Sequence, residues 1–451
     1  MTNNALPSAF ISRMRAQLGA DFPDYLAAMA REPVLSLRVN GLKTSAAELA
    51  ASAGAEMVPN GVCPDGFLAP ADLQSGKHPL HAAGLYYFQE ASAQLPVELL
   101  DVAPGMAVLD LCAAPGGKST QIAAKLQGSG VLLSNEIEPA RAKVLLSNLE
   151  RMGVTNALVT RMQPNALAHA LPESFDRVLV DAPCSGEGMF RKDPAAAAHW
   201  SPEHVRACAL RQGKILSDAA ATLKPGGWLV YATCSFSQEE NEGVVVDFLQ
   251  GRQDFRLLGT HRLYPHNSLG EGQFAAVLAR DGAVSPSCYA LPDAKPCAAF
   301  SEFCAENLKL SPDFSIRTLP DGRVLALPPL PFSPDGLHVL RAGLLLGEIV
   351  GATHHASQST HHAPQSARAQ RTRFVPAHAL AMAGRESPFR RRAELDWDGA
   401  LAYLAGQTLP ACLPSGWCAV CFAGHALGVG KVVNGEMKNH YPKGLRVSSA
   451  K

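Results

Sequence analysis

Residues 81–281 alternate between short apolar runs and amphipathic stretches, and this alternation restricts the possible folds more than any other feature. Short apolar runs bounded by turn signals are typical of buried strands, and the stretches between them have helical spacing. Strands that alternate with helices form a parallel sheet with helices on both faces. The sequence therefore predicts an α/β domain, and such sheets bind ligands beyond the carboxyl ends of their strands.

The first predicted strand of this region runs into a glycine turn, Pro115-Gly-Gly117, which Lys118-Ser-Thr120 follows. The Gly-Lys-Ser sequence resembles the end of a phosphate-binding loop, but that loop requires a glycine where Cys112 stands. Pro115 also removes one of the backbone amides on which a phosphate cradle depends. A strand, a glycine turn and a helix still place helix amides beside a ligand, so we expect the turn to serve a different ligand.

The second predicted strand, 131–136, ends on Glu136, about twenty residues after the glycine turn. At that spacing a carboxylate can bind the two hydroxyls of a ribose. The turn and the acid together predict an adenosine-type cofactor.

Two later strands of the same region end near cysteines. The strand 175–181 ends on Asp181 and is followed by Ala-Pro-Cys184, and the strand 228–233 is followed directly by Cys234. Either cysteine alone is best interpreted as a small buried hydrophobe. Since the carboxyl ends of parallel strands meet at one edge of a sheet, two cysteines at corresponding ends favour a shared active site.

A chain of 451 residues is long for one hydrophobic core, and we expect it to divide into domains. The predicted segments are an N-terminal α+β module (1–80), the α/β domain (81–281), a linker (282–300), an intermediate domain (301–390) and a C-terminal β domain that resembles a small barrel (391–451). The 40 basic and 40 acidic residues balance, so nucleic-acid binding can depend only on local patches. No apolar run is long enough to cross a bilayer and the N-terminus lacks the pattern of an export signal, so we expect a cytoplasmic protein without a membrane partner.

The cysteines and histidines do not form a metal pattern. Eleven cysteines in a reducing compartment are expected as free thiols. Cys418-Ala-Val-Cys421 has no second pair to complete a zinc site and lies in an apolar run, which favours core packing. The four histidines within 353–364 have no acidic or cysteine residues beside them, which favours a solvated loop. We therefore predict no metal ion.

Three long motifs in the α/β domain resemble those of a known family. The strings LDLCAAPGGKST, VDAPCSGEGMFRKDP and YATCSFSQEENEGVV are similar to the central motifs of the Nol1/Nop2/Sun RNA (cytosine-5) methyltransferases, and with the N-terminal module and the tail GKVVNGEMKNHYPKGLR the likeness extends over nearly the whole chain. The bacterial members that modify small-subunit ribosomal RNA look most similar. The resemblance implies a Rossmann-like class I core with a mostly parallel seven-stranded sheet, a C-terminal PUA-like RNA-binding β-barrel, and S-adenosyl-L-methionine as cofactor.

The same resemblance implies catalytic roles for four residues. Carbon 5 of cytosine is a weak nucleophile, and a thiolate that adds to carbon 6 makes it reactive. That thiol would be Cys234, and Cys184 would assist the release of the product. Asp181 would hydrogen-bond the cytosine ring nitrogen and stabilise the developing charge. Lys118 would lower the pKa of a nearby thiol or contact the base, unless it is an exposed lysine of the first helical turn.

The resemblance also assigns the cofactor site. Glu136 would bind the ribose, Arg141 matches a cofactor-side arginine of the family, and Gln163 would meet the adenine, with Asn165 as a competing residue. The remaining predicted cofactor residues are Asp181 and the loop that holds the methionine part, namely Cys112, Ala113, Ala114, Pro115, Gly116, Gly117 and Lys118.

A cytosine stacked in RNA must be turned outward before Cys234 can reach its ring. RNA contacts would come from local groups, although each group taken alone is more often a solvated surface group than a contact: Arg38, Asn40, Phe190–Lys192, Arg390–Arg392 and Lys438–Lys443. The stretch with His81, Tyr86, Gln89 and Glu90 is interpreted as pocket wall.

Three alternative functions compete with this interpretation. A DNA cytosine-5 methyltransferase would use Cys184 as its nucleophile and leave Cys234 idle, and the PUA-like tail and the Thr-Cys-Ser motif argue against it. A second alternative is methylation of transfer RNA, and a third is an RNA-binding ribosome assembly factor without turnover. The favoured partner is small-subunit ribosomal RNA or the 30S particle, and the protein is expected to be a monomer.

Overall fold

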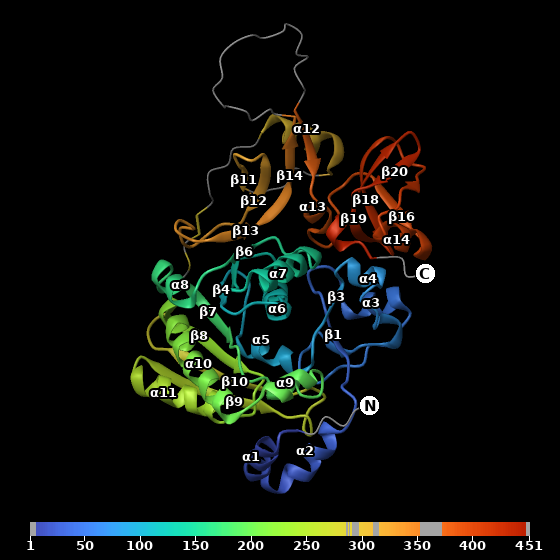
Figure 1. The fold of residues 1–451 in the computed structure, drawn as a ribbon. Coiled ribbons are helices and arrows are strands. Elements are labelled where there is room, and N and C mark those ends of the chain that lie inside the picture. Colours follow the sequence, from blue (N-terminus) through green and yellow to red (C-terminus); the bar gives the residue numbers. More distant parts are fainter. Residues whose placement is uncertain are drawn as a thin grey trace, which may run out of the picture.

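The computed structural model describes residues 6–285, 287, 289–290, 297–309, 315–351 and 372–447. Within these residues the strands form four sheets, of three, eight, four and five strands. The eight-stranded sheet and its helices form the centre of the molecule, and the other three sheets lie around it (Figure 1).

The central sheet has the strand order β13-β6-β5-β4-β7-β8-β10-β9. Neighbouring strands from β6 to β8 are parallel, and β10 is antiparallel to both β8 and β9. The strands are β4 (Ala107–Asp110), β5 (Val131–Asn135), β6 (Ala157–Thr160), β7 (Phe175–Asp181), β8 (Leu223–Thr233), β9 (Phe255–Leu263) and β10 (Gln273–Arg280). The predicted α/β class with seven mostly parallel strands is confirmed. An eighth strand, β13 (Val339–Ala342), pairs antiparallel with β6 from outside the predicted domain.

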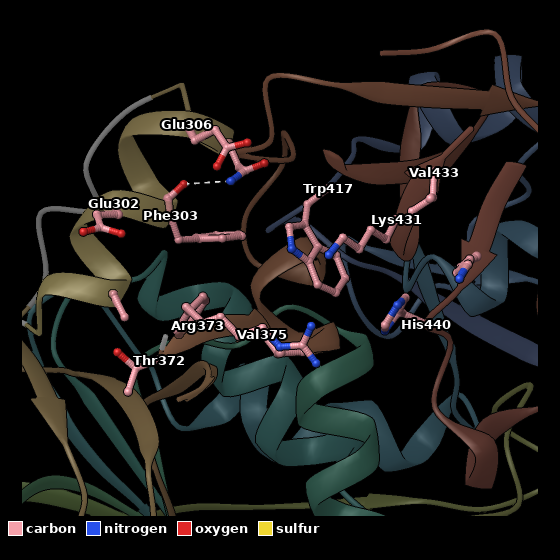
Figure 2. Close-up of a pocket in the computed structure, with 14 residues that line it drawn as sticks. Glu302, Phe303, Glu306, Thr372, Arg373, Val375, Trp417, Lys431, Val433 and His440 are labelled. Carbon is pink, nitrogen blue, oxygen red and sulfur yellow. Dashed lines mark hydrogen bonds between the residues drawn. The ribbon is translucent and has the colours of Figure 1, made fainter. Parts of the chain in front are cut away.

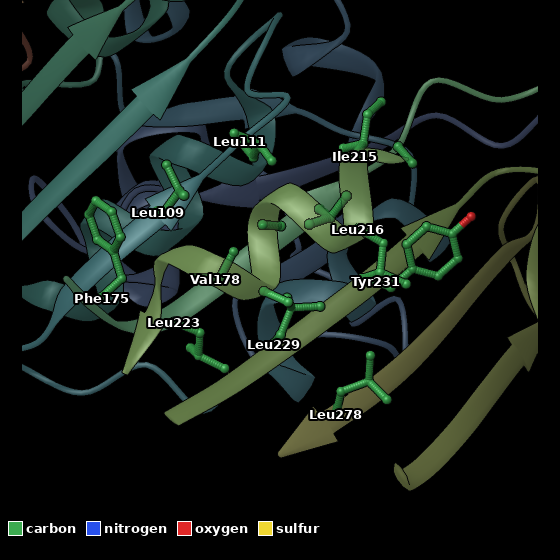
Figure 3. Close-up of a cluster of buried hydrophobic side chains, with 14 of the residues drawn as sticks. Leu109, Leu111, Phe175, Val178, Ile215, Leu216, Leu223, Leu229, Tyr231 and Leu278 are labelled. Carbon is green, nitrogen blue, oxygen red and sulfur yellow. The ribbon is translucent and has the colours of Figure 1, made fainter. Parts of the chain in front are cut away.

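Helices cover both faces of this sheet because successive strand residues point to opposite faces. Val108 joins a buried cluster with α5, α6 and α7, whereas Leu109 joins a second cluster with α8, α10 and α11 (Figure 3). Each fully buried leucine contributes roughly 1.5–3 kcal/mol relative to an exposed one. The helices are α5 (Leu95–Leu99), α6 (Gly117–Leu126), α7 (Pro139–Arg151), α8 (Pro164–Ala170), α9 (Pro194–His199), α10 (Pro202–Thr222) and α11 (Val244–Gly251).

The strand order fixes where a ligand can bind. The chain proceeds from β4 outward to β5 and β6, and then returns to β7 on the other side of β4. Loops on the two sides of such a switch point leave a crevice at the carboxyl ends of the strands. The segments after β4, β5, β7 and β8 therefore meet at one edge of the sheet.

The N-terminal residues pack as two separate units. Helices α1 (Ser8–Leu18) and α2 (Phe22–Met29) lie against the segment that follows Cys184, where the ring centroids of Phe10 and Phe190 are 5.0 Å apart. The antiparallel sheet β2-β1-β3 belongs to a different hydrophobic cluster. Since β3 pairs with β1, this sheet extends beyond the boundary predicted at residue 80. Its elements are β1 (Ser36–Val39), α3 (Ala46–Ala53), β2 (Gly66–Leu68), α4 (Pro79–Ala82) and β3 (Tyr86–Phe88).

The predicted linker 282–300 is partly structured. Helix α12 begins at Ala298, and the Tyr289 hydroxyl donates to the Gly105 carbonyl oxygen at 2.9 Å. The intermediate domain that follows has a four-stranded sheet of order β11-β12-β14-β15. Its elements, apart from β13, are α12 (Ala298–Asn307), β11 (Ser315–Thr318), β12 (Arg323–Leu327), β14 (Leu344–Val350), β15 (Arg373–Pro376) and α13 (His378–Met382).

The C-terminal domain has a five-stranded sheet of order β16-β18-β19-β20-β17. Strand β18 packs on two neighbours through its two faces. Cys418 joins the cluster of the N-terminal sheet, whereas Cys421 joins the cluster of the intermediate domain. Both thiols are buried and free, so the predicted core packing is confirmed. The elements are β16 (Arg392–Leu395), α14 (Trp397–Leu404), β17 (Leu409–Pro410), β18 (Gly416–Phe422), β19 (His425–Val433) and β20 (Glu436–Asn439).

The described residues contain neither a membrane-spanning helix nor a metal cluster. No helix there has both the length and the apolar character needed to cross a membrane. No group of three or more histidine, cysteine, aspartate or glutamate side chains in that part of the chain is arranged to hold a metal ion. The histidine-rich stretch 353–364 lies outside the described residues.

Candidate functional site

A cavity of about 680 Å³ lies at the carboxyl ends of the central strands. It brings together eight of the predicted site residues from separate loops and helices: Cys112, Lys118, Glu136, Arg141, Gln163, Asp181, Cys184 and Cys234. Its volume lies within the range of about 300–1,000 Å³ that is common for small-molecule and cofactor sites.

The two predicted cysteines face each other in this cavity. The Sγ atoms of Cys184 and Cys234 are 3.3 Å apart. The backbone amide of Gly188 donates to the Cys234 carbonyl oxygen at 2.7 Å, which links the turn after β7 to the turn after β8. A Cβ atom at residue 188 would lie 2.7 Å from that same oxygen, so the close approach requires glycine.

The pKa of the Cys184 thiol is raised above its ordinary value. Its hydrogen bond with Cys234 is the largest cause, followed by burial and by the negative charges of Cys234 and Glu240. Because burial and neighbouring negative charge both disfavour a thiolate, Cys184 stays protonated near neutral pH.

An ion pair lies beside the thiols. The Nζ atom of Lys118, at the start of α6, is 2.7 Å from Oδ2 of Asp181 at the end of β7. Burial alone would lower the pKa of Lys118, but the Asp181 carboxylate raises it overall. The Lys118 side chain is only 11% exposed, so the alternative interpretation of this residue as an exposed lysine is wrong.

The opposite end of the cavity carries the predicted cofactor residues. Glu136 is buried, and its carboxylate accepts the backbone amide of Glu138 at 3.0 Å and lies 3.5 Å from the Arg141 guanidinium. Gln163 lines the cavity, whereas Asn165 is not among the described residues that do so. The Asn165 side chain instead accepts the backbone amide of Ala166 in the first turn of α8.

The predicted cofactor loop contributes only its two ends to the cavity lining. Cys112 and Lys118 line it, but none of the described residues Ala113–Gly117 does. Ala113 and Ala114 are buried in the core cluster of α6 and α7. Gly116 adopts a left-handed conformation with φ of 110°, and a Cβ atom there would lie 3.2 Å from the Leu145 side chain of α7.

A buried acid supports this loop and was not predicted. Asp110, the last residue of β4, is fully buried and accepts the Ser119 hydroxyl at 2.6 Å. Burial raises the pKa of Asp110 to about 7. The position of Asp110 at the end of a strand, before the glycine turn, is the sequence feature that could have predicted its supporting role. Glu271 and Gln273 also line the cavity and were missed, because they lie at the start of an antiparallel strand that carries no motif.

Several residues expected to contact RNA are buried instead. The Arg38 guanidinium donates to the Gly117 carbonyl oxygen and to Thr120, and Asn40 donates to the Gly84 and Met152 carbonyl oxygens. Arg191 is ion-paired with Glu271 at 2.6 Å. The prediction of RNA contacts at these three positions is wrong, because each side chain holds two segments of the protein together.

The expected pocket wall is confirmed for one residue of four. Glu90 lines the cavity. His81 and Tyr86 pack within the N-terminal module, where their ring centroids are 5.4 Å apart. The Gln89 side chain accepts a hydrogen bond from Arg38.

A second cavity, of about 600 Å³, lies between the intermediate and C-terminal domains. Figure 2 shows the Lys431 side chain lying along Trp417, with its Nζ atom 5.2 Å from the ring centroid. Glu302 and Glu306 of α12 line the opposite wall. Arg373, Lys431 and Lys438 also line this cavity, and none of them forms an ion pair with a carboxylate of the described residues.

Three protein-family models match separate parts of the chain. The sequence model described as "16S rRNA methyltransferase RsmB/F" matches residues 97–280. The N-terminal domain of 16S rRNA methyltransferase RsmF matches residues 6–91, and the methyltransferase RsmF PUA domain matches 390–447. The chain belongs to the RsmB/F family of 16S rRNA methyltransferases. The resemblance seen in the three motifs, including the F-type (RsmF) subgroup, is thereby confirmed.

Known members of the RsmB/F family share substantial sequence with the chain. Ribosomal RNA small subunit methyltransferase F of Escherichia coli O139:H28 is 44% identical over 250 residues, which are 53% of this chain and 52% of that protein. The chain thus spans about half the length of the curated relatives it matches.

Solved structures share the fold. A methyltransferase homologue from Pyrococcus horikoshii is 28% identical with a TM-score of 0.55, and the match covers 62% of this chain and 96% of the other. NSun6 from Pyrococcus horikoshii, solved with SFG, has 21% identity and a TM-score of 0.56, and the match covers 62% of this chain and all of that one.

Proposed function

We propose that this protein methylates carbon 5 of cytosine in RNA, with S-adenosyl-L-methionine as the methyl donor. The observation that carries the proposal is the pair of thiols 3.3 Å apart beside the Lys118–Asp181 ion pair. A nucleophile, a second thiol and a preorganised pair of charges in one cavity match the needs of covalent methylation of a pyrimidine.

The donor set at the other end of the cavity fits the cofactor. Glu136 offers a buried carboxylate for the ribose hydroxyls, and Ile137, Pro164 and Leu111 provide apolar surface for an adenine ring. We assign the remaining cofactor contacts to Arg141, Gln163, Asp181 and the backbone of Cys112–Lys118. When bound, S-adenosyl-L-methionine supplies a methyl group on a positively charged sulfur.

The first step is assigned to Cys234. Its thiolate forms a bond to carbon 6 of the cytosine, and the electron pair of the ring double bond makes carbon 5 nucleophilic while charge develops at ring nitrogen 3. The Lys118–Asp181 pair stabilises this charge. The Lys118 ammonium donates to the Asp181 carboxylate at 2.7 Å, so both charges are in place before the ring charge develops.

The second step releases the product. Once carbon 5 carries the methyl group, its proton passes to a water molecule, the electron pair of that C–H bond re-forms the ring double bond, and the bond between sulfur and carbon 6 breaks, with its electrons returning to Cys234 as a thiolate. We assign assistance in this step to Cys184, because its thiol is the group that is hydrogen-bonded to the departing sulfur.

The substrate is proposed to be small-subunit ribosomal RNA, free or in the 30S particle, acted on by a monomeric cytoplasmic enzyme. The names of the matching relatives support this choice. We propose that the C-terminal domain contributes to RNA binding through the second cavity, where Arg373, Lys431 and Lys438 are available for phosphates.

The test supplies labelled S-adenosyl-L-methionine with separate pools of transfer RNA, naked ribosomal RNA and assembled small subunits, and maps the methylated base. Cys234→Ala should abolish methylation, whereas Cys184→Ala should leave a covalent RNA adduct that survives denaturation. Cys412→Ala, which removes an exposed thiol, is the matched control. Normal turnover by Cys184→Ala would overturn its role, and methylation only of transfer RNA would overturn the substrate. A folded wild-type protein that methylates no RNA would favour the silent assembly factor.

A further inference from the structure

A buried carboxylate connects the turns that carry the two thiols. Glu240 is fully buried in the helical turn Glu239–Gly243 that follows Cys234. Its Oε2 atom accepts the backbone amide of Ser185 at 2.9 Å, and its Oε1 atom accepts the hydroxyls of Ser185 and of Ser235, the latter at 2.7 Å. These two serines directly follow Cys184 and Cys234 in the sequence. One side chain therefore contacts the neighbours of both sulfur-bearing residues.

The position of the Glu240 carboxylate is itself fixed by further contacts. The Gln212 side chain of α10 donates to Oε2 at 2.8 Å, and the Tyr231 hydroxyl donates to the Glu240 backbone carbonyl oxygen at 2.6 Å. A buried charge is costly unless donors surround it. Since both oxygens of Glu240 are occupied by donors from three segments, a change at one segment is transmitted to the other two.

A second buried acid reinforces the same connection. Glu187, in the turn after Cys184, accepts the backbone amide of Phe236 at 2.7 Å and the indole N–H of Trp200 at 2.8 Å. Burial raises the pKa of Glu187, and the nearby charge of Glu240 raises it further. Both buried acids therefore connect the turn after Cys184 with the turn after Cys234.

We propose that Glu240 is a positioning residue that holds the two sulfur atoms in contact and places a fixed negative charge on the Cys184 side of the pair. The inference rests on the proposed function, in which both thiols act in one reaction. Lys118, which carries the opposite charge, lines the same cavity as both thiols. The negative charge of Glu240 disfavours a thiolate at Cys184, so Cys184 keeps its S–H group.

Cys234 and Glu240 act on the pKa of Cys184, and Tyr231 interacts with it as well. The other charged groups that line the same cavity near the thiols are Arg211, Lys118, Asp181 and Glu271. Burial raises the pKa of Tyr231 well above its ordinary value, so this residue is neutral across the working range. Glu240 is therefore the charged group whose removal should change the titration of Cys184 most directly.

The test compares Glu240→Gln with Glu239→Gln, which removes the adjacent, half-exposed carboxylate that pairs with Arg13. The protein without RNA is treated with iodoacetamide from pH 6 to 10, and alkylation of Cys184 and Cys234 is read by peptide mass spectrometry. In Glu240→Gln the midpoint for Cys184 should move to lower pH by on the order of one unit. With RNA and cofactor, kcat should fall about 10- to 100-fold with little change in KM, because the sulfur atoms are less well placed. Glu239→Gln should resemble the wild type in both readouts.

Ser185→Ala covers the case in which Glu240→Gln does not fold. It removes one hydroxyl donor but keeps the charge, so kcat should fall while the Cys184 alkylation profile stays in place. A folded Glu240→Gln protein whose Cys184 profile superimposes on the wild type would overturn the proposal, as would a Ser185→Ala protein with unchanged kcat. The alkylation readout needs no methyl transfer. A profile shift in a protein without activity would thus support the positioning role while the proposed function failed.

Discussion

Two cavities of the described residues, the one at the strand ends and the one between the intermediate and C-terminal domains, differ in how their charges are paired. In the cavity at the strand ends, Lys118 is paired with Asp181, and Arg141 lies 3.5 Å from Glu136. In the cavity between the intermediate and C-terminal domains, Lys431 and Lys438 have no carboxylate partner among the described residues. A fixed pair of charged side chains can stabilise a charge that develops during a reaction, whereas an unpaired cation can bind an anionic group of a ligand. This difference supports the proposals that the first cavity carries out the chemistry and that the second contributes to RNA binding.

The cavities also differ in how they are built. The first is lined by segments that follow adjacent strands of one sheet, and buried bonds such as that from Ser119 to Asp110 support them. The second is lined by α12, β15, β18, β19 and β20, which belong to two domains. A site on one rigid sheet keeps reacting atoms at fixed distances. A site between two domains does not need this precision, because its cations have only to remain accessible to a flexible ligand.

Among the charged groups of the two cavities, the largest effect is expected from breaking the charge pair of the first cavity. Asp181→Asn removes the carboxylate beside Lys118, and kcat should fall by roughly 10²- to 10³-fold, the scale that follows the removal of one preorganised charge-stabilising group. Single-turnover methylation at saturating RNA measures this. Asp247→Asn, at an exposed position of α11, is the matched control. Turnover by Asp181→Asn at the wild-type rate would mean that the pair is structural only.

A smaller effect is expected at the second cavity. The double variant Lys431→Ala/Lys438→Ala removes two unpaired cations, and we expect RNA affinity to fall about tenfold at moderate salt while kcat at saturating RNA stays unchanged. The slope of log K against log salt should decrease by about 0.7 for each phosphate of a single strand that is no longer neutralised. Filter binding at several salt concentrations measures both quantities. Lys77→Ala/Lys214→Ala removes two lysines elsewhere on the chain, and an equal decrease in this control would contradict a specific site.

The residues of the first cavity could be predicted because their positions follow from strand ends. The apolar run before Cys234 fixes the end of β8, and the run before Asp181 fixes the end of β7. Parallel strands then bring both residues to one edge of the sheet. Glu240 escaped the same reasoning although it lies within a motif, because a glutamate in the polar stretch beyond a strand gives no sign of its burial.

The outer domains were harder to predict because burial there depends on contacts between distant segments. Arg38 lies in the short strand β1, but its partner Gly117 lies 79 residues further along the chain. No periodicity within 35–40 indicates that this arginine faces the catalytic domain. The second cavity was likewise invisible, since Phe303 and Trp417 meet only when two domains pack together.

The smallest effect is expected at Asp110, the buried acid that supports the first cavity. Burial raises the pKa of Asp110 from 3.8 to about 7, so the folded protein retains a proton that the unfolded chain has released. The stabilising contribution of this group is therefore complete below about pH 4 and is lost as the pH rises through about 7. Asp110→Asn never ionises and keeps an acceptor for Ser119, so its Tm should fall less between pH 5 and pH 8 than that of the wild type, by a few degrees. Thermal unfolding at both pH values measures the difference. Glu306→Gln, an exposed carboxyl of the second cavity, should keep the wild-type dependence. If Tm changed equally between pH 5 and pH 8 in Asp110→Asn and in the wild type, Asp110 would already be ionised at pH 5. The two cavities would then not differ in the protonation of a buried acid.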